Sequence, residues 1–160
     1  MDHGGNQGIV RRYFAATADA ARTGDLEPLR EIIHPEFEFA PHITGGHEGL
    51  EFIGFEGLSS FIALQAETWE SLSAEATEMR GLGDAVVALG TIRAQGRGSG
   101  VRVEEPAVWL CRFRDDRLLR LEAHAARDRG RVAWALAQAG LPPGSFDAPR
   151  ESGEAAGSTD

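Results

Sequence analysis

An ordered series of signals near the N-terminus constrains the fold more than any other part of the sequence. Apolar side chains recur at helical spacing from about Gly8 to Arg22, which predicts an amphipathic helix. Its apolar side carries Ile9, Val10, Tyr13, Phe14 and Thr17. Gly24 ends this helix, and Asp25 can cap a second one. The core residues of that second helix would be Leu26, Leu29, Ile32 and Ile33.

The remainder of the chain alternates between strand and turn signals. Phe37 and Phe39 alternate with acidic residues and predict a strand after Pro35. A Gly-rich connection follows over residues 41–57, and Gly57 leads into a third helix. That helix would carry Leu58, Phe61, Ile62, Gln65 and Trp69. Strands are predicted over residues 85–92, 101–114 and 118–125, joined by turns at residues 97–100 and 115–116.

The order of these elements predicts the fold class and the domain boundaries. Helices come first and an antiparallel meander follows, which is typical of an α+β domain. Asp128 can cap a last helix, and Gly140 with the prolines after it ends that helix. We expect residues 1–7 to be disordered, residues 8–141 to form one domain, and the polar tail over residues 142–160 to be disordered.

The composition of the chain argues against several kinds of binding partner and cellular location. Sixteen cationic residues oppose 25 acidic ones, so the formal charge of −9 argues against binding to nucleic acid or to an anionic membrane. Cys111 is the single cysteine, and it has no metal-ligand spacing around it. No apolar run is long enough for a membrane span and no signal peptide is evident. We expect a cytoplasmic protein without metal or cofactor.

Several short segments, taken in order, resemble a SnoaL-like protein of the nuclear transport factor 2-like superfamily. They cover roughly residues 8–141 and are Ile9–Phe14, Gly24-Asp25-Leu26, His34-Pro35-Glu36, Gly54–Leu58, Gly96–Gly100 and Arg112–Asp116. The resemblance implies a cone, in which a curved, mostly antiparallel sheet wraps around the N-terminal helices. It also implies an apolar pocket inside the cone and a homodimer paired through the outer face of the sheet. On this mapping Val108, Leu110, Leu89 and Thr91 point outward.

The catalytic residues of two enzymes of this superfamily are absent from this chain. Ketosteroid isomerase needs a carboxylate base and a second acidic donor, but the corresponding positions hold Ala40 or Pro41 and Trp109. Limonene epoxide hydrolase needs an aspartate where this chain has Ala123. Counting back from Gly24 places Thr17, not Tyr13, at the position of the isomerase tyrosine, with Tyr13 one helical turn away. The resemblance therefore implies a pocket but does not indicate which reaction, if any, takes place in it.

The candidate site residues follow from this mapping. His42, at the pocket mouth, is the candidate base, and Tyr13 is the candidate hydrogen-bond donor to a developing oxyanion. The alternatives are a solvated loop histidine for His42 and a core residue for Tyr13. The candidate ligand-binding residues are Thr17, Phe39, Trp69, Gly90, Trp109 and Ala123. Gly90 and Ala123 are chosen because their small side chains leave room for a ligand.

The other polar candidates have structural interpretations. We expect Glu38 to face solvent, Glu104 and Glu105 to form a solvated charge pair, and His34 to interact favourably with the dipole at a helix end. His47 would lie in a solvated loop, and His124 would face away from the pocket.

Three functional hypotheses remain open at this point. The first is a cone that binds a small hydrophobic molecule and catalyses proton transfer of the isomerase, cyclase or dehydratase type. The second is a non-catalytic module that binds a ligand or a partner. The third is a scaffold whose pocket has collapsed, with no cavity around Trp69 and Trp109.

Overall fold

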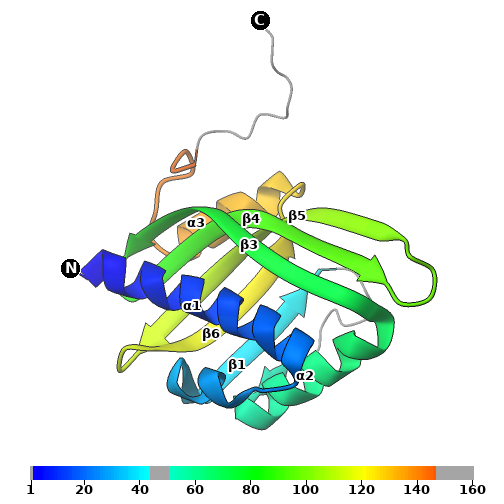
Figure 1. Ribbon diagram of the computed structural model, residues 1–160. Helices are drawn as coiled ribbons and strands as arrows, with labels where there is room; N and C mark the ends of the chain where they lie inside the picture. The colour runs from blue at the N-terminus through cyan, green and yellow to red at the C-terminus, as the bar shows by residue number, and fades with distance from the viewer. Residues whose placement is uncertain (1, 44–50, 147–160) are drawn as a thin grey trace, which may run out of the picture.

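A bent sheet wraps around the N-terminal helix, as Figure 1 shows. The computed structural model describes residues 2–43 and 51–146. The elements are α1 (Asp2–Thr23), η1 (Glu27–Glu31), β1 (Ile33–His42), β2 (Phe52–Ile53), α2 (Gly54–Thr68), β3 (Trp69–Leu82), β4 (Ala85–Gly96), β5 (Arg102–Arg114), β6 (Arg117–Ala125) and α3 (Arg129–Gln138). The predicted α+β class is confirmed. His47, most of the Gly-rich connection and most of the predicted tail lie outside the described residues.

The described strands form one six-stranded sheet in the order β2-β1-β6-β5-β4-β3. Its pairings are antiparallel except between β1 and β6, which run parallel. In that parallel pair Glu38 lies opposite Arg120, Ala40 opposite Glu122, and His42 opposite His124. The first long strand of the chain is therefore joined to the last one.

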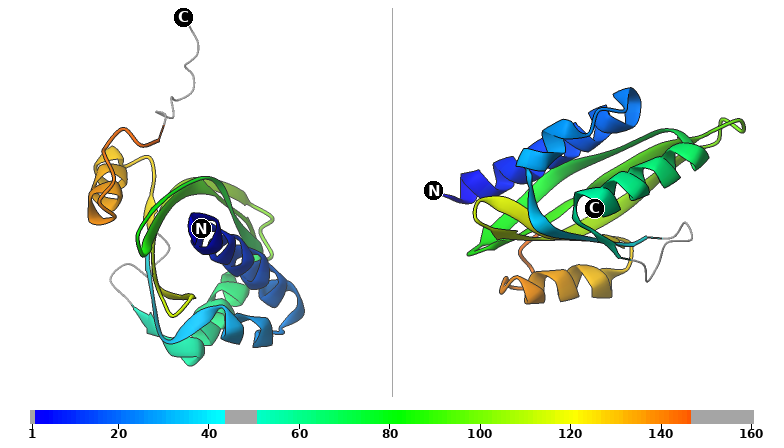
Figure 2. Two further views of the ribbon diagram at one scale, coloured as in Figure 1. Left: turned by 90° about the vertical axis from the view of Figure 1, so that its left-hand side faces the viewer. Right: turned by 90° about the horizontal axis from the view of Figure 1, so that it is seen from below.

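The two faces of the sheet carry two separate apolar clusters, because successive side chains of a strand point to opposite faces. The concave face packs on α1 through Val86, Ala88, Ala107, Trp109, Cys111, Leu121 and Ala123. The convex face packs Val87, Val108 and Leu110 against Ala135, Leu136 and Ala139 of α3. Figure 2 shows α1 and α3 on opposite sides of the sheet.

The helical elements differ from the sequence prediction in their extent. Helix α1 begins at Asp2, six residues before the predicted start at Gly8. The predicted second helix is the short 3-10 helix η1, with Pro28 in its first turn, and the chain enters β1 already at Ile33. Helix α2 begins at Gly54 and ends at Thr68, so Trp69 is the first residue of β3.

Strand β3 is the one long element that the sequence analysis did not predict. Its residues are mainly Glu, Ser, Ala and Thr, which have modest β-propensity apart from Thr. The strand pairs with β4 along its length and contains register shifts between Trp69 and Ser71 and between Ala76 and Glu78. Tertiary pairing therefore decides its conformation.

The structure confirms the turn predicted at residues 115–116 and the two predicted ends of the last helix. Asp115 and Asp116 both have positive φ, 56° and 62°, in the turn between β5 and β6. The Asp128 side chain accepts a hydrogen bond from the Arg131 amide at 3.2 Å and so caps α3. Gly140, with φ 78°, follows the end of that helix.

Helix α3 covers the outward apolar residues that the sequence analysis assigned to a dimer interface. Val108 is fully buried and Leu110 is 4% exposed within a single chain. The apolar part of the outer face is therefore covered without a second copy, and the homodimer stays a prediction from the family resemblance. Within the described residues, no helix is long and apolar enough to cross a membrane.

Candidate functional site

Four of the predicted site residues lie together inside the cone. Tyr13, Phe39, Trp109 and Ala123 belong to the same buried cluster. Its aromatic rings touch one another: the ring centroids of Phe14 and Trp109 are 4.7 Å apart, and those of Tyr13 and Phe37 are 6.0 Å apart. Near α2, the centroids of Phe39 and Phe61 are 4.6 Å apart in an edge-to-face arrangement. These four residues therefore share one buried cluster on the inner side of the sheet.

Tyr13 brings a polar group into this apolar interior. Tyr13 is 4% exposed, and its ring lies beside those of Phe14 and Phe37. Burial, with a smaller contribution from the nearby Cys111 thiol, raises the pKa of Tyr13 well above its usual value. The phenol therefore stays protonated and can donate a hydrogen bond.

Three other predicted lining residues have different surroundings. The Thr17 hydroxyl donates to the Phe14 carbonyl at 3.0 Å, so its hydrogen is already used within α1. Trp69 pairs with Gly96 where β3 begins, and it lies outside the cluster that holds Tyr13. A Cβ built on Gly90 would lie 1.8 Å from the Glu75 carbonyl oxygen. The space beside Gly90 is thus filled by the backbone of β3, and the prediction that it leaves room for a ligand needs this correction.

Glu105 lies on the concave side of β5, contrary to the predicted solvated pair. It is two residues before the buried Ala107 and pairs with Ile92, which packs on the inner cluster. Only 14% of its side chain is exposed, whereas Glu104 is 68% exposed and pairs with Arg93. Arg127 donates to Glu105 Oε1 at 3.0 Å and lies 2.8 Å from Oε2. The alternation along β5 from Trp109 is the signal that could have placed Glu105 inside.

His42 lies on the outer face of the sheet and is not brought together with Tyr13. Its ring stacks on His124 of the neighbouring strand, with centroids 4.8 Å apart and an angle of 13° between the planes. His124 is 3% exposed and meets Trp134 of α3 edge to face at 5.2 Å. The prediction that His124 faces away from the cone is confirmed, and His42 shares that orientation.

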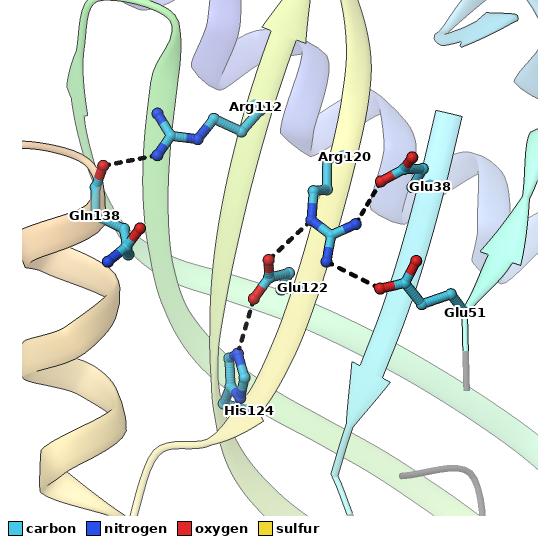
Figure 3. A network of polar contacts seen from close by, with 7 residues as sticks. All are labelled: Glu38, Glu51, Arg112, Arg120, Glu122, His124 and Gln138. Atoms are coloured by element: carbon cyan, nitrogen blue, oxygen red, sulfur yellow. Dashed lines mark hydrogen bonds and ion pairs between the residues drawn. The ribbon is translucent and has the colours of Figure 1, made fainter. Parts of the chain in front are cut away.

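A polar network joins β1 and β6 beside this histidine pair, as Figure 3 shows. Glu122 Oε1 lies 3.3 Å from His124 Nε2, and its Oε2 accepts from Arg120 Nε at 2.8 Å. The same guanidinium donates to Glu38 and, at 3.3 Å, to Glu51. Three carboxylates thus surround one arginine. Glu38 faces outward as predicted, but it is paired with Arg120 instead of being simply solvated.

The network sets the charges of its members. Hydrogen bonds from His124 and Arg120 lower the pKa of Glu122 to about 2, against the effect of burial, so this carboxylate is ionised at neutral pH. Burial first, and then electrostatic interaction with His124, Arg131 and Arg120, lowers the pKa of His42, while Glu122 acts in the opposite direction. His42 is therefore a neutral imidazole at neutral pH.

These shifts predict acid destabilisation in two windows. The folded-state pKa of His42 is below the reference value of 6.5, so its contribution to stability is complete above about pH 6.5 and is lost as the pH falls. The contribution of Glu122 is complete above pH 4.5 and is lost between pH 4.5 and about 2. Urea unfolding across this range should show a shallower decline below pH 4.5 for Glu122→Gln than for the parent. Parallel curves for the two proteins would contradict the assignment to Glu122.

Two hollows formed by described residues both lie outside the cone. One, of about 250 Å³, lies on the outer face among Glu36, Glu38, Asp84, Arg112, Arg114, Leu119 and Arg120. The other, of about 760 Å³, is an open depression between α1 and η1. Neither is lined by Trp69 or Trp109.

Comparison with known proteins identifies relatives of this fold. The model of the SnoaL-like domain matches residues 10–121. A putative SnoaL-like polyketide cyclase from Jannaschia sp. CCS1 is 22% identical, with a TM-score of 0.64 over 84% of this chain and 90% of that one. A hypothetical protein with a ketosteroid isomerase-like fold from Catenulispora acidiphila DSM 44928, in complex with trimethylamine, is 20% identical, with a TM-score of 0.62 over 84% of this chain and 94% of that one.

A third solved structure, TerC co-crystallized with polyporic acid, is 22% identical, with a TM-score of 0.61 over 76% of this chain and 91% of that one. At these identities the likeness shows the fold alone. A search of the curated proteins finds no match.

Proposed function

Because the chain belongs to the family of SnoaL-like domains, we propose that its cone binds a small, mostly apolar molecule carrying one hydrogen-bond acceptor. The observation that carries this proposal is the position of the Tyr13 phenol, which lies among aromatic side chains inside the cone and stays protonated. A ligand carbonyl or carboxylate oxygen that reached this hydroxyl would accept a hydrogen bond from it.

The surroundings of Tyr13 suit the apolar part of such a ligand. Phe14, Phe37 and Trp109 present aromatic surface beside the phenol, and Cys111 adds a buried thiol whose raised pKa keeps it neutral. A ligand held at Tyr13 would therefore contact these rings.

Binding without catalysis is favoured by the positions of the ionisable groups. His42 is on the opposite face of the sheet, so it is not available as a base inside the cone. Glu105 is on the concave side, but it is six residues from Cys111 along β5, which corresponds to about 20 Å of extended strand. A small molecule held at Tyr13 is therefore out of reach of this carboxylate.

Proton transfer by Glu105 is the second candidate function. It is favoured by the concave location and low exposure of that carboxylate, which a solvated surface residue would not have. A substrate for this reaction would sit at the Glu105 end of β5, near Arg127, and not at Tyr13. Loss of turnover in Glu105→Gln with unchanged binding at Tyr13 would identify this function.

The proposed role of the phenol predicts how Tyr13→Phe changes stability and ligand affinity. Without ligand, the free energy of unfolding should stay within about 1 kcal/mol of the parent, because the substitution removes one hydroxyl and keeps the buried aromatic ring. With polyporic acid as an acceptor-bearing probe, the affinity should fall about tenfold, the equivalent of one neutral hydrogen bond. Calorimetric titration and urea unfolding measure the two quantities.

Trimethylamine serves as the matched control probe, since as a cation at neutral pH it offers no acceptor to the phenol. Its affinity should not respond to Tyr13→Phe. The proposal fails if neither probe binds at millimolar concentration, or if polyporic acid binds the parent and Tyr13→Phe equally well.

A further inference from the structure

We propose that His42, Glu122 and His124 bind a divalent, zinc-like cation on the outer face of the sheet. These three residues offer two imidazole nitrogens and one carboxylate oxygen, and their ligand atoms all lie within 4.8 Å of one another. Two histidines and one glutamate are a donor set that zinc accepts with a fourth position left for water. The cluster lies on the opposite face from Tyr13, so it is independent of the ligand site proposed for the cone.

The strand register places the donors side by side. His42 and His124 are direct partners in the parallel pair of β1 and β6, so their side chains leave the same face of the sheet. Glu122 is two residues before His124 on the same strand and therefore shares that face. The backbone thus fixes the approach of all three side chains, as a metal site requires.

The observed separation of Glu122 and His124 already fits a tetrahedral ion. Glu122 Oε1 and His124 Nε2 are 3.3 Å apart. Two ligand atoms on a tetrahedral zinc, each bonded at about 2.0–2.1 Å, are also separated by about 3.3 Å. A cation can therefore replace the shared proton between these two atoms, and His42 must approach by about 1.5 Å at most. His42 is the last residue of β1, where such a ring movement meets the least constraint.

The surrounding groups orient the donors. Arg120 holds Glu122 Oε2 at 2.8 Å, which leaves Oε1 directed at His124. Trp134 packs on the His124 ring and fixes its plane. Such contacts around the ligands are typical of metal sites because they set the direction of each donor.

The local charge also suits a cation. Glu38, Glu51 and Glu122 bring three negative charges to the single guanidinium of Arg120. Arg131 acts on His42 from α3 and is a second cation near the site. One carboxylate charge is left over even when both arginines are counted.

The test is a calorimetric titration of the untagged full chain with zinc chloride at pH 7.5. We expect one zinc per chain with micromolar or tighter affinity, a higher melting temperature, and weakening of at least tenfold in His42→Ala and in Glu122→Gln. His34→Asn and Glu36→Gln are the matched controls, because they change a histidine and an acid of the same strand outside the cluster. Both controls should bind as the parent does.

A second measurement on the parent chain covers the case in which a variant does not fold. Zinc should shift the imidazole NMR signals of His42 and His124, and cobalt in its place should give the strong visible absorption of a tetrahedral site. The proposal is overturned if zinc does not bind, if those imidazole signals stay unchanged, or if folded His42→Ala and Glu122→Gln bind zinc as tightly as the parent.

Discussion

Replacing Gly90 by alanine should lower the free energy of unfolding by at least about 3 kcal/mol. A Cβ at this position would lie 1.8 Å from the Glu75 carbonyl oxygen, 2.8 Å from the Glu75 carbonyl carbon and 2.9 Å from the Ala76 Cα. All three are backbone atoms, so no side chain can rotate away to relieve the overlap. The methyl group must push β3 away from β4 next to the register shift after Ala76.

Gly8→Ala is the matched control for this substitution. Gly8 lies within α1, and a Cβ there would meet no atom within 4 Å. Alanine at this helical position should raise the free energy of unfolding by about 0.5–1 kcal/mol. Urea denaturation of both variants measures the contrast. A Gly90→Ala protein within 1 kcal/mol of the parent would show that β3 does not approach β4 as described.

Leu136→Ala should cost about 2–5 kcal/mol of stability. Leu136 is 1% exposed and packs in the outer cluster with Val87, Val108 and Leu110, so its truncation leaves a cavity between α3 and the sheet. The same change loosens the helix that covers the apolar outer face. We therefore also expect the variant to self-associate more than the parent, since an uncovered apolar face favours association.

The control for α3 is Gln138→Ala. Gln138 is exposed, and only its backbone carbonyl accepts the 2.7 Å hydrogen bond from Arg112, which the substitution keeps. Its stability should stay within about 0.5 kcal/mol of the parent. Thermal unfolding and sedimentation velocity test both variants. If Leu136→Ala behaved like Gln138→Ala, α3 would be a loosely attached segment and not part of the core.

The sequence was sufficient to predict the cone and most of its inner face. Helical spacing around Tyr13, turn residues at Asp115 and Asp116, and alternation through Trp109 are local signals that the tertiary structure keeps. Strand β3 was not predictable in this way. Its conformation comes from pairing with β4, and its composition carries no strong preference for a strand.

The candidate site was harder to predict for two reasons. Strand β3 was not predicted, and the alternation of side chains along β1 and β5 was not extended to His42 and Glu105. Phe39 points into the cone, so strict alternation already places His42, three residues later, on the outer face. The same rule applied from Trp109 places Glu105 inside. Gly90 was assigned to the correct face, but the close approach of β3 could not be anticipated without that strand. Arg120, Glu122 and His124 occupy alternate positions of β6, so the sequence alone predicts that they share the outer face.

The parallel contact of β1 with β6 has a consequence for the order of events during synthesis. Residues 33–42 leave the ribosome early, but their sheet partner is residues 117–125, and the ion pair of Glu38 with Arg120 spans 82 positions of the chain. Closing so long a loop is entropically costly and slow. The apolar residues of β1, Phe37 and Phe39 among them, therefore lack β6, their parallel neighbour, until nearly the whole domain has been translated. A nascent chain that stops before β6 exposes this segment to aggregation and to chaperones.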